Sequence, residues 1–311
     1  MSSHSTPGAG PSSGTGLHGA AVNLQQRRRP VERVIKGALL VCALLSVAIT
    51  IGIVLALIEP VIHFFAEVPF SAFFATSGEF AVIPLVGATL MVTAIALLVA
   101  VPLGLGAAMY LSEYASPRVR KVLKPTLELL AGVPSVVYGF FALAFVTPTL
   151  LQDILAIDVG FLNALAAGLV LGVMVIPTIA SLAEDALTAV PRALRQGSFA
   201  MGANRMQTTV RVVIPAALSG VAAAVVLGLS RAIGETMIVA LAAGGRKNLS
   251  ADPREGMQTM TGFIAQTATG ESTPGSLGYN TLFAVGLLLF VMTLIINIVS
   301  IALVRRFRQV Y

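Results

Sequence analysis

The sequence contains very little charge. Only 11% of its 311 residues are Asp, Glu, Lys or Arg, whereas 56% are hydrophobic, and the mean hydropathy is +0.89. A soluble protein carries about 25% charged residues, because its surface needs them. The composition therefore excludes a soluble globular domain and indicates an integral membrane protein.

Residue types that bind metals or form cross-links are also scarce. Cys42 is the single cysteine, there is no tryptophan, and the only histidines are His4, His18 and His63. One cysteine excludes an intramolecular disulfide and a thiolate-bound metal cluster, and we expect no zinc or haem site. The net charge is +6, but the basic residues flank apolar runs instead of forming one patch. We therefore expect no nucleic-acid partner, and we relate the basic residues to membrane topology.

Motifs of ATP-hydrolysing and hydrolytic enzymes are missing in their usual context. The sequence has no G-x-x-x-x-G-K-[ST] and no H-E-x-x-H, and G-x-S-x-G occurs only at residues 10–14, within the Ser-, Gly- and Pro-rich N-terminal segment and not between a predicted strand and a helix. Gly104 and Gly106 form a G-x-G inside an apolar run, which is more typical of close helix packing than of a nucleotide site. We expect this chain to be no enzyme and to bind no cofactor itself.

Long apolar runs dominate what is present. A helix crosses the hydrocarbon core with about 20 apolar residues, and six stretches reach that length. We predict an all-α membrane protein whose six spans are Ile35–Ile58, Val82–Leu111, Pro125–Leu150, Phe161–Ala183, Ala216–Ala243 and Tyr279–Val304.

The basic residues predict the direction of the spans. Sixteen of the 20 lysines and arginines lie before span one, between spans two and three, between spans four and five, or after span six. By the positive-inside rule, we expect both termini of this multi-pass membrane protein to be cytoplasmic. Residues 1–26 are rich in Ser, Gly and Pro and are not a signal peptide. We divide the chain into a disordered basic tail, 1–34, and a six-helix domain, 35–311.

Two segments on the opposite side carry apolar side chains. Six phenylalanines between Glu59 and Ala81 suit either a segment in the membrane interface or an ordinary packed loop. Between Gly245 and Gly278, apolar residues at helical spacing predict a short surface helix over Met257–Ala268, which could dock an extracytoplasmic partner.

Two charged residues lie within the predicted fifth span. Arg231 and Glu235 are four residues apart, so on one helix they would share a face and could pair. A charge at this depth costs about 2.5–3.5 kcal/mol and normally faces a bundle interior or a wet cavity. One reading is a buried pair that only fixes helix packing. The other is an oxyanion pathway, in which Arg231 supplies a planar donor fork and Glu235 partly neutralises it.

Weaker candidates for the same pathway lie in spans three and four. Glu128 lies near the start of span three, followed by Ser135 and Tyr138 next to Pro134, and Thr178 follows Pro177 in span four. Proline in a span frees a backbone carbonyl, which is tolerated beside a cavity. Ordinary kinks and hydroxyl bonds to the helix backbone are the better explanation of each residue when it is taken alone.

The segment between spans four and five, residues 184–215, is long and polar. Its Gln196, Gly197 and Gly202, followed by Pro215, resemble the EAA loop of binding-protein-dependent ABC importer permeases, roughly E-A-A-x-x-x-G, nine residues, then I-x-L-P. The resemblance implies two short helices meeting at Gly202 and contacting a separate ATPase. Gln196 stands where the pattern has Glu, so we expect neighbours such as Arg205 to contribute more to this contact.

Four segments together resemble the PstC-type permease subunit of the phosphate-specific ABC importer. They are Leu103–Tyr114, Leu127–Phe141, Ile176–Ala186 and Leu229–Thr236. The resemblance covers residues 35–311 and implies a type I ABC importer permease fold. It also implies the partners: a PstA-type permease forming a heterodimer, two copies of an ATPase that uses ATP and Mg²⁺, and an extracytoplasmic phosphate-binding protein.

Alternative functions stay open at this point. The chain could be the PstA-type subunit itself, or a permease for another oxyanion such as sulfate or molybdate. From a different class, it could be a secondary transporter or a membrane-embedded enzyme, which would more often show paired intramembrane carboxylates or inverted repeats.

Overall fold

The computed structural model describes residues 30–270, 273 and 275–306, and all regular secondary structure within them is helical. The predicted tail, 1–26, lies outside these residues. The elements, with η marking π-helical segments, are α1 (Pro30–Glu67), α2 (Phe70–Phe73), α3 (Ile83–Met109), η1 (Tyr110–Tyr114), α4 (Pro117–Ala131), α5 (Ser135–Phe141), η2 (Ala142–Ile154), α6 (Ala164–Thr188), α7 (Arg192–Ala200), α8 (Arg205–Thr208), η3 (Thr209–Val213), α9 (Ile214–Ile233), α10 (Met237–Ala242), α11 (Met260–Thr269) and α12 (Leu277–Arg306).

Six helical stretches within the described residues are long and apolar enough to cross a membrane, which confirms the predicted fold class. They are Glu32–Glu67, Ile83–Tyr114, Ser135–Ile154, Ala164–Thr188, Arg205–Ile233 and Leu277–Ala302. The chain divides into two compact units, Met1–Ile53 and Val54–Tyr311. The core that positions the candidate site belongs to the second unit.

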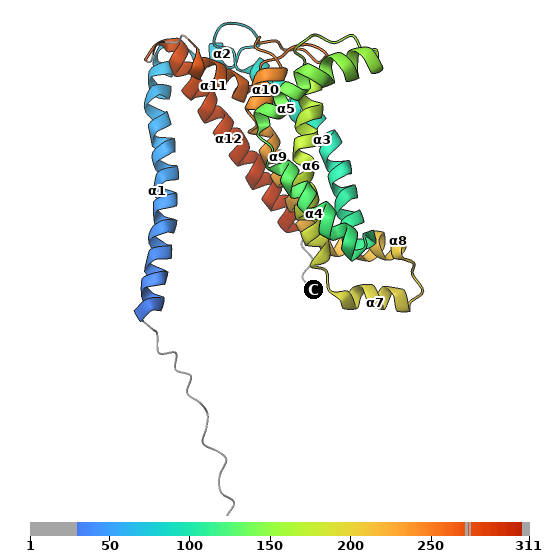
Figure 1. Ribbon diagram of the computed structural model, residues 1–311. Helices are drawn as coiled ribbons and strands as arrows, with labels where there is room; N and C mark the ends of the chain where they lie inside the picture. Colours follow the sequence, from blue (N-terminus) through green and yellow to red (C-terminus); the bar gives the residue numbers. More distant parts are fainter. Residues whose placement is uncertain (1–29, 271–272, 274, 307–311) are drawn as a thin grey trace, which may run out of the picture. The chain divides into compact units, whose positions relative to one another are not determined.

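Small residues allow the central helices of this unit to pack closely. Helices α3 and α6 run side by side, and α7 and α8 lie at the opposite end of them from α10 and α11 (Figure 1). A Cβ atom on Gly168 would lie 2.7 Å from Ile95 Cβ, and one on Gly172 would lie 2.9 Å from the Ala96 carbonyl oxygen. Helix α9 meets α6 in the same way, since a Cβ on Gly228 would lie 2.7 Å from Ile179. Such contacts drive helix association where water is absent.

Span three begins later than the prediction Pro125–Leu150. Helix α4 ends at Ala131, with Gly132 as its C-cap, and α5 starts at Ser135 after Pro134. Proline lacks an N–H and disfavours helical geometry in the residue before it, and α4 ends just before Pro134, although α6 continues through Pro177. Helix α4 is therefore a separate amphipathic helix and the membrane-length stretch is Ser135–Ile154.

The two segments with apolar side chains pack into one cluster. Phe64 and Phe73 are buried, with ring centroids 5.6 Å apart, whereas Phe70 and Phe74 are exposed. A packed segment therefore describes these buried rings better than an interfacial one. The predicted helix over Met257–Ala268 exists as α11, but Met260 is fully buried in the same cluster. The expectation of a surface helix with a free apolar face is wrong for this residue.

Candidate functional site

The predicted fifth span is interrupted beside its charged residues. Helix α9 ends at Ile233, Gly234 is its C-cap, and α10 begins at Met237. The carboxylate of Glu235 accepts hydrogen bonds from the backbone N–H groups of Met237 at 3.0 Å and Ile238 at 3.3 Å. Thr236 is the N-cap of α10 and makes no side-chain capping bond, so the Glu235 carboxylate, one residue earlier, supplies the acceptor for these first N–H groups.

The expected pairing of Arg231 with Glu235 is wrong. Because the helix stops between them, the two side chains do not share one helix face, and none of the ion pairs among the described residues joins them. Arg231 Nη1 instead donates to Thr178 Oγ1 of α6 at 3.3 Å. Arg231 is exposed in this single chain, and its guanidinium carries five N–H donors.

Polar groups from two other helices surround the interruption. The Ser230 hydroxyl bonds to Asn297 Oδ1 of α12. The Thr261 hydroxyl, at the start of α11, donates to the backbone carbonyl of Glu235 at 2.6 Å. Sequence reasoning missed both Asn297 and Thr261, although an amide within the last apolar run was a visible signal. The arrangement joins a guanidinium, hydroxyls and an amide near a break in a membrane-spanning helix.

Two predicted pathway residues lie near the break before α5. Ser135 is the first residue of α5. The Tyr138 hydroxyl donates to the Leu130 carbonyl of α4 at 3.1 Å. The same carbonyl also accepts from the backbone N–H of Val133 at 3.3 Å, so the tyrosine adds a second bond at the end of α4. Tyr138 therefore has a structural role at this break, in addition to any contact with a transported substrate.

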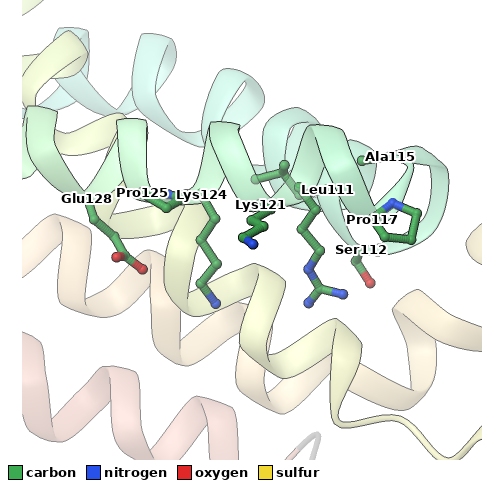
Figure 2. Close-up of a pocket in the computed structure, with 9 residues that line it drawn as sticks. Leu111, Ser112, Ala115, Pro117, Lys121, Lys124, Pro125 and Glu128 are labelled. Carbon is green, nitrogen blue, oxygen red and sulfur yellow. The ribbon is translucent and has the colours of Figure 1, made fainter.

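Glu128 is placed differently from the prediction. It lies on α4, outside the third span, and is exposed. With Lys121, Lys124 and Pro125 it lines a pocket of about 480 Å³. In Figure 2, Lys124 and Glu128 extend from the same side of α4. The residues that line this pocket come from the region between Leu111 and Glu128 and include none from the break at Gly234.

A buried carboxylate connects α4 to α6. The side chain of Glu184 is 0% exposed; it pairs with Arg120 and with Lys124 Nζ at 2.6 Å, and the Thr188 hydroxyl donates to it at 3.0 Å. Lys124 Nζ also lies 2.7 Å from Asp185 Oδ1. Hydrogen bonds to Asp185 and then to Glu184 raise the pKa of Lys124 above 10.5. Sequence reasoning noted Glu184 and Asp185 only as the polar start of a loop.

The loop 184–215 forms the two helices that its resemblance implied. Gly202 follows α7 with a φ of +82°, a conformation that glycine adopts without strain. Asn204 begins α8, where its side chain accepts from the Gln207 N–H at 2.8 Å while Gln207 Oε1 accepts from the Asn204 N–H at 3.0 Å. This reciprocal capping fixes the turn between α7 and α8.

The predicted contact residues of this loop are on its surface. Gln196 and Gly197 lie on the exposed side of α7, and Pro215 is the second residue of α9. The Arg205 guanidinium lies 5.8 Å from the ring centroid of Tyr114, a distance at which a cation and an aromatic face attract. Large apolar side chains are exposed beside them, namely Phe199, Met201 and Met206.

Comparison with known proteins gives consistent matches. Residues 100–309 match the family described as "Binding-protein-dependent transport system inner membrane component". A probable ABC transporter permease protein of Bacillus subtilis, YqgH, is 40% identical over 216 residues, which cover 69% of each chain. The phosphate transport system permease protein PstC 1 of Mycobacterium tuberculosis is 37% identical over 245 residues, which cover 72% of each chain.

Solved structures of two importers have the same fold. A chain of the inward-facing MetNI methionine ABC transporter aligns with a TM-score of 0.55 at 20% identity, over 73% of this chain and 94% of that one. A chain of a bacterial alginate ABC transporter, solved with an alginate-bound periplasmic protein, aligns with a TM-score of 0.63 at 18% identity, over 89% of this chain and 98% of that one. The fold is therefore that of ABC importer permeases.

Proposed function

Because this chain belongs to the family of binding-protein-dependent transport system inner membrane components, we propose that it is a permease subunit of an ATP-driven importer of inorganic phosphate. The observation that carries this assignment is the similarity to phosphate transport permeases, 37% identity over 72% of the chain in one case and 32% over 74% in another. The relatives are transport subunits, so ATP hydrolysis belongs to a separate protein.

The importer needs further subunits. We propose that a PstA-type permease completes the translocation pathway as a heterodimer and that two ATPase copies use ATP and Mg²⁺. An extracytoplasmic phosphate-binding protein would deliver the substrate. The solved alginate transporter contains a periplasmic protein, which supports this composition by analogy. The exposed face of α9 around Arg231 suits contact with a second permease across a shared pathway.

We propose that Arg231 binds the phosphate oxyanion during transport. Its guanidinium presents a planar fork of N–H donors that matches phosphate oxygens. The bond to Thr178 Oγ1 uses one donor on Nη1 and orients the group, while Ser135, Tyr138, Glu128 and Glu235 are assigned to the surroundings of the pathway. Binding of phosphate through the single guanidinium of Arg231 is weak enough to allow release of the ion.

We further propose that both termini, including the tail 1–34, and the loop 184–215 face the cytoplasm, where Gln196, Gly197, Gly202, Arg205 and Pro215 contact the ATPase. Single cysteines in a Cys42→Ala background test this orientation. A membrane-impermeant thiol reagent added to intact cells should label a Glu255→Cys variant and leave an Ala200→Cys variant unlabelled. The reverse pattern would reject the orientation.

The substrate is tested with the purified complex in vesicles. Wild-type complex supplied with ATP, Mg²⁺ and its binding protein should accumulate inorganic phosphate, and uptake should stop without ATP. Uptake of sulfate or molybdate but no phosphate would reject the substrate and keep the permease assignment. Uptake that needs an ion gradient and no ATPase would favour a secondary transporter.

A further inference from the structure

The guanidinium of Arg195 joins α7 to the ends of two membrane-spanning helices. Its Nη2 donates to Glu113 Oε1 at 2.9 Å, and its Nε lies 3.3 Å from the same oxygen. The other donors reach backbone carbonyls at the end of α6: Nη2 to Leu187 at 2.8 Å and Nη1 to Val190 at 2.5 Å. Glu113 belongs to η1, which continues α3. One side chain thus connects three helices.

This ion pair is largely buried, although both side chains also line an open pocket. The side chains of Arg195 and Glu113 are 17% and 8% exposed, and the Ser112 hydroxyl also donates to Glu113 Oε1 at 3.0 Å. A largely buried charge-assisted pair is stronger than one on an open surface. Removing one member leaves the other charge poorly solvated.

Few other groups hold α7 to the rest of the chain. Helix α7 has no fully buried residue, although Leu194 packs against the apolar cluster around Leu187. The bond between Ser198 and Thr208 lies within the loop itself. Residues 189–215 contain no Asp or Glu, so the counter-charge for Arg195 comes from another element, through Glu113.

We propose that Arg195 is a positioning residue that, through Glu113, transmits displacement of α7 to the cytoplasmic ends of α3 and α6. The proposal rests on the proposed function, in which α7 contacts the ATPase. A planar fork held by four hydrogen bonds keeps α7 in one orientation relative to both spans. Energetic coupling between distant sites requires such contiguous contacts, and the Arg195–Glu113 pair is the ion pair that connects α7 to another described element.

The coupling between ATP hydrolysis and phosphate import distinguishes this proposal from simple stabilisation of the fold. In the purified complex in vesicles, we expect Arg195→Met to retain ATP hydrolysis while phosphate imported per ATP falls by about tenfold, the scale of ordinary coupling energies. Glu113→Gln, on a different helix, should lower the same ratio, and Arg195→Lys should restore it in part because it keeps the charge. Arg192→Met is the matched control, since Arg192 lies on α7 and is exposed.

Three results would overturn the proposal. The first is a reduced amount of Arg195→Met complex with an unchanged ratio of phosphate to ATP, which means stabilisation only. The second is loss of ATPase copurification in Arg195→Met, which makes Arg195 a docking residue. The third is a normal ratio in Glu113→Gln.

A distance measurement tests transmission without reference to the substrate. Spin labels on Ala115→Cys and Ala200→Cys, in a Cys42→Ala background, report the separation of η1 and α7. In the wild-type complex this separation should stay constant when a non-hydrolysable ATP analogue binds, and in Arg195→Met it should change. An equal change in both proteins would overturn the proposal, whereas absent phosphate uptake by the wild type would reject only the proposed substrate.

Discussion

Glu235 follows Arg231 by four residues, yet its carboxylate binds the N–H groups that start α10 while Arg231 binds Thr178 across the helix interface. The first prediction tests the role of this carboxylate as a cap. Glu235→Gln should keep the thermal unfolding midpoint of the purified protein nearly unchanged, because an amide oxygen still accepts from both N–H groups. Glu235→Ala should lower the free energy of unfolding by about 1 kcal/mol, the usual cost of a missing cap, and the midpoint should fall with it.

Equal midpoints for the alanine and glutamine variants would show that the cap contributes nothing to stability. If Glu235→Gln keeps its midpoint but loses phosphate uptake, the negative charge itself acts in transport.

The second prediction concerns Arg231. Arg231→Lys keeps the charge and loses the planar fork, so phosphate uptake should fall in part; Arg231→Met should abolish it while the protein still assembles, because this side chain is exposed in the single chain. Thr178→Val, which removes only the 3.3 Å bond that orients the guanidinium, should lower uptake less than Arg231→Met does. Normal uptake by Arg231→Met would reject a role in the pathway.

The third prediction concerns the carboxylate that joins α4 to α6. Glu184→Gln removes the charge that pairs with Arg120 and Lys124. Because these two side chains are 35% and 30% exposed and Lys124 keeps Asp185, the free energy of unfolding should fall by about 1.5–3 kcal/mol, the range for a hydrogen bond to a charged group. Arg118→Gln, on the exposed part of α4, is the control. Equal denaturation midpoints for the two variants would contradict this prediction.

The fourth prediction follows from the raised pKa of Lys124, whose first cause is the hydrogen bond to Asp185. A raised folded-state pKa stabilises the protein fully below pH 10.5, and the stabilisation disappears as the pH rises through the folded-state value. Between about pH 9 and about pH 12 the wild type should therefore lose more thermal stability than Lys124→Met. Parallel losses in the two proteins would show that this pair contributes no pH dependence.

The fifth prediction uses the backbone of Gly202. A Cβ atom there would have no neighbour within 4 Å, but φ is +82°, so substitution strains the backbone without a steric clash. Gly202→Val should lower the free energy of unfolding by about 1–2 kcal/mol through strain at the turn, and it should lower phosphate uptake. Gly202→Asn should keep both values closer to those of the wild type, because Asn tolerates this conformation. Similar uptake by the two variants would mean that the turn conformation is not needed.

The length of the apolar runs predicted the six spans, because a run of about 20 apolar residues is enough to identify a membrane-spanning helix. The ends of spans three and five were wrong for local reasons. Before α5, Pro134 has no N–H with which to continue the backbone hydrogen bonds of the preceding helix. After Gly234, the Glu235 carboxylate accepts from the first N–H groups of a new helix. A hydropathy value averaged over the length of a span does not detect either of these breaks.

The candidate site was predictable where a residue is unusual in its own segment. Arg231 was found because it lies in an apolar run, and the turn at Gly202 because it resembles a known loop. The partner of Arg231, Thr178, is 53 residues away in the chain, and Arg195 and Glu113 are 82 residues apart. Sequence spacing contains no information about such contacts, since only the packing of helices brings them together.

Glycines on α6 and α9 allow α6 to pack closely against α3 and α9, so these three helices form one rigid unit. Side chains of Ile95 and Ile179 fill the space where Gly168 and Gly228 have no Cβ, so sliding one helix past another would drive these side chains into backbone. The movement that opens a permease to alternate sides must then bend the chain elsewhere. The helices are interrupted at residues 132–134 and 234–236, so bending at these breaks would not disturb the glycine contacts, and the second break lies three residues after Arg231.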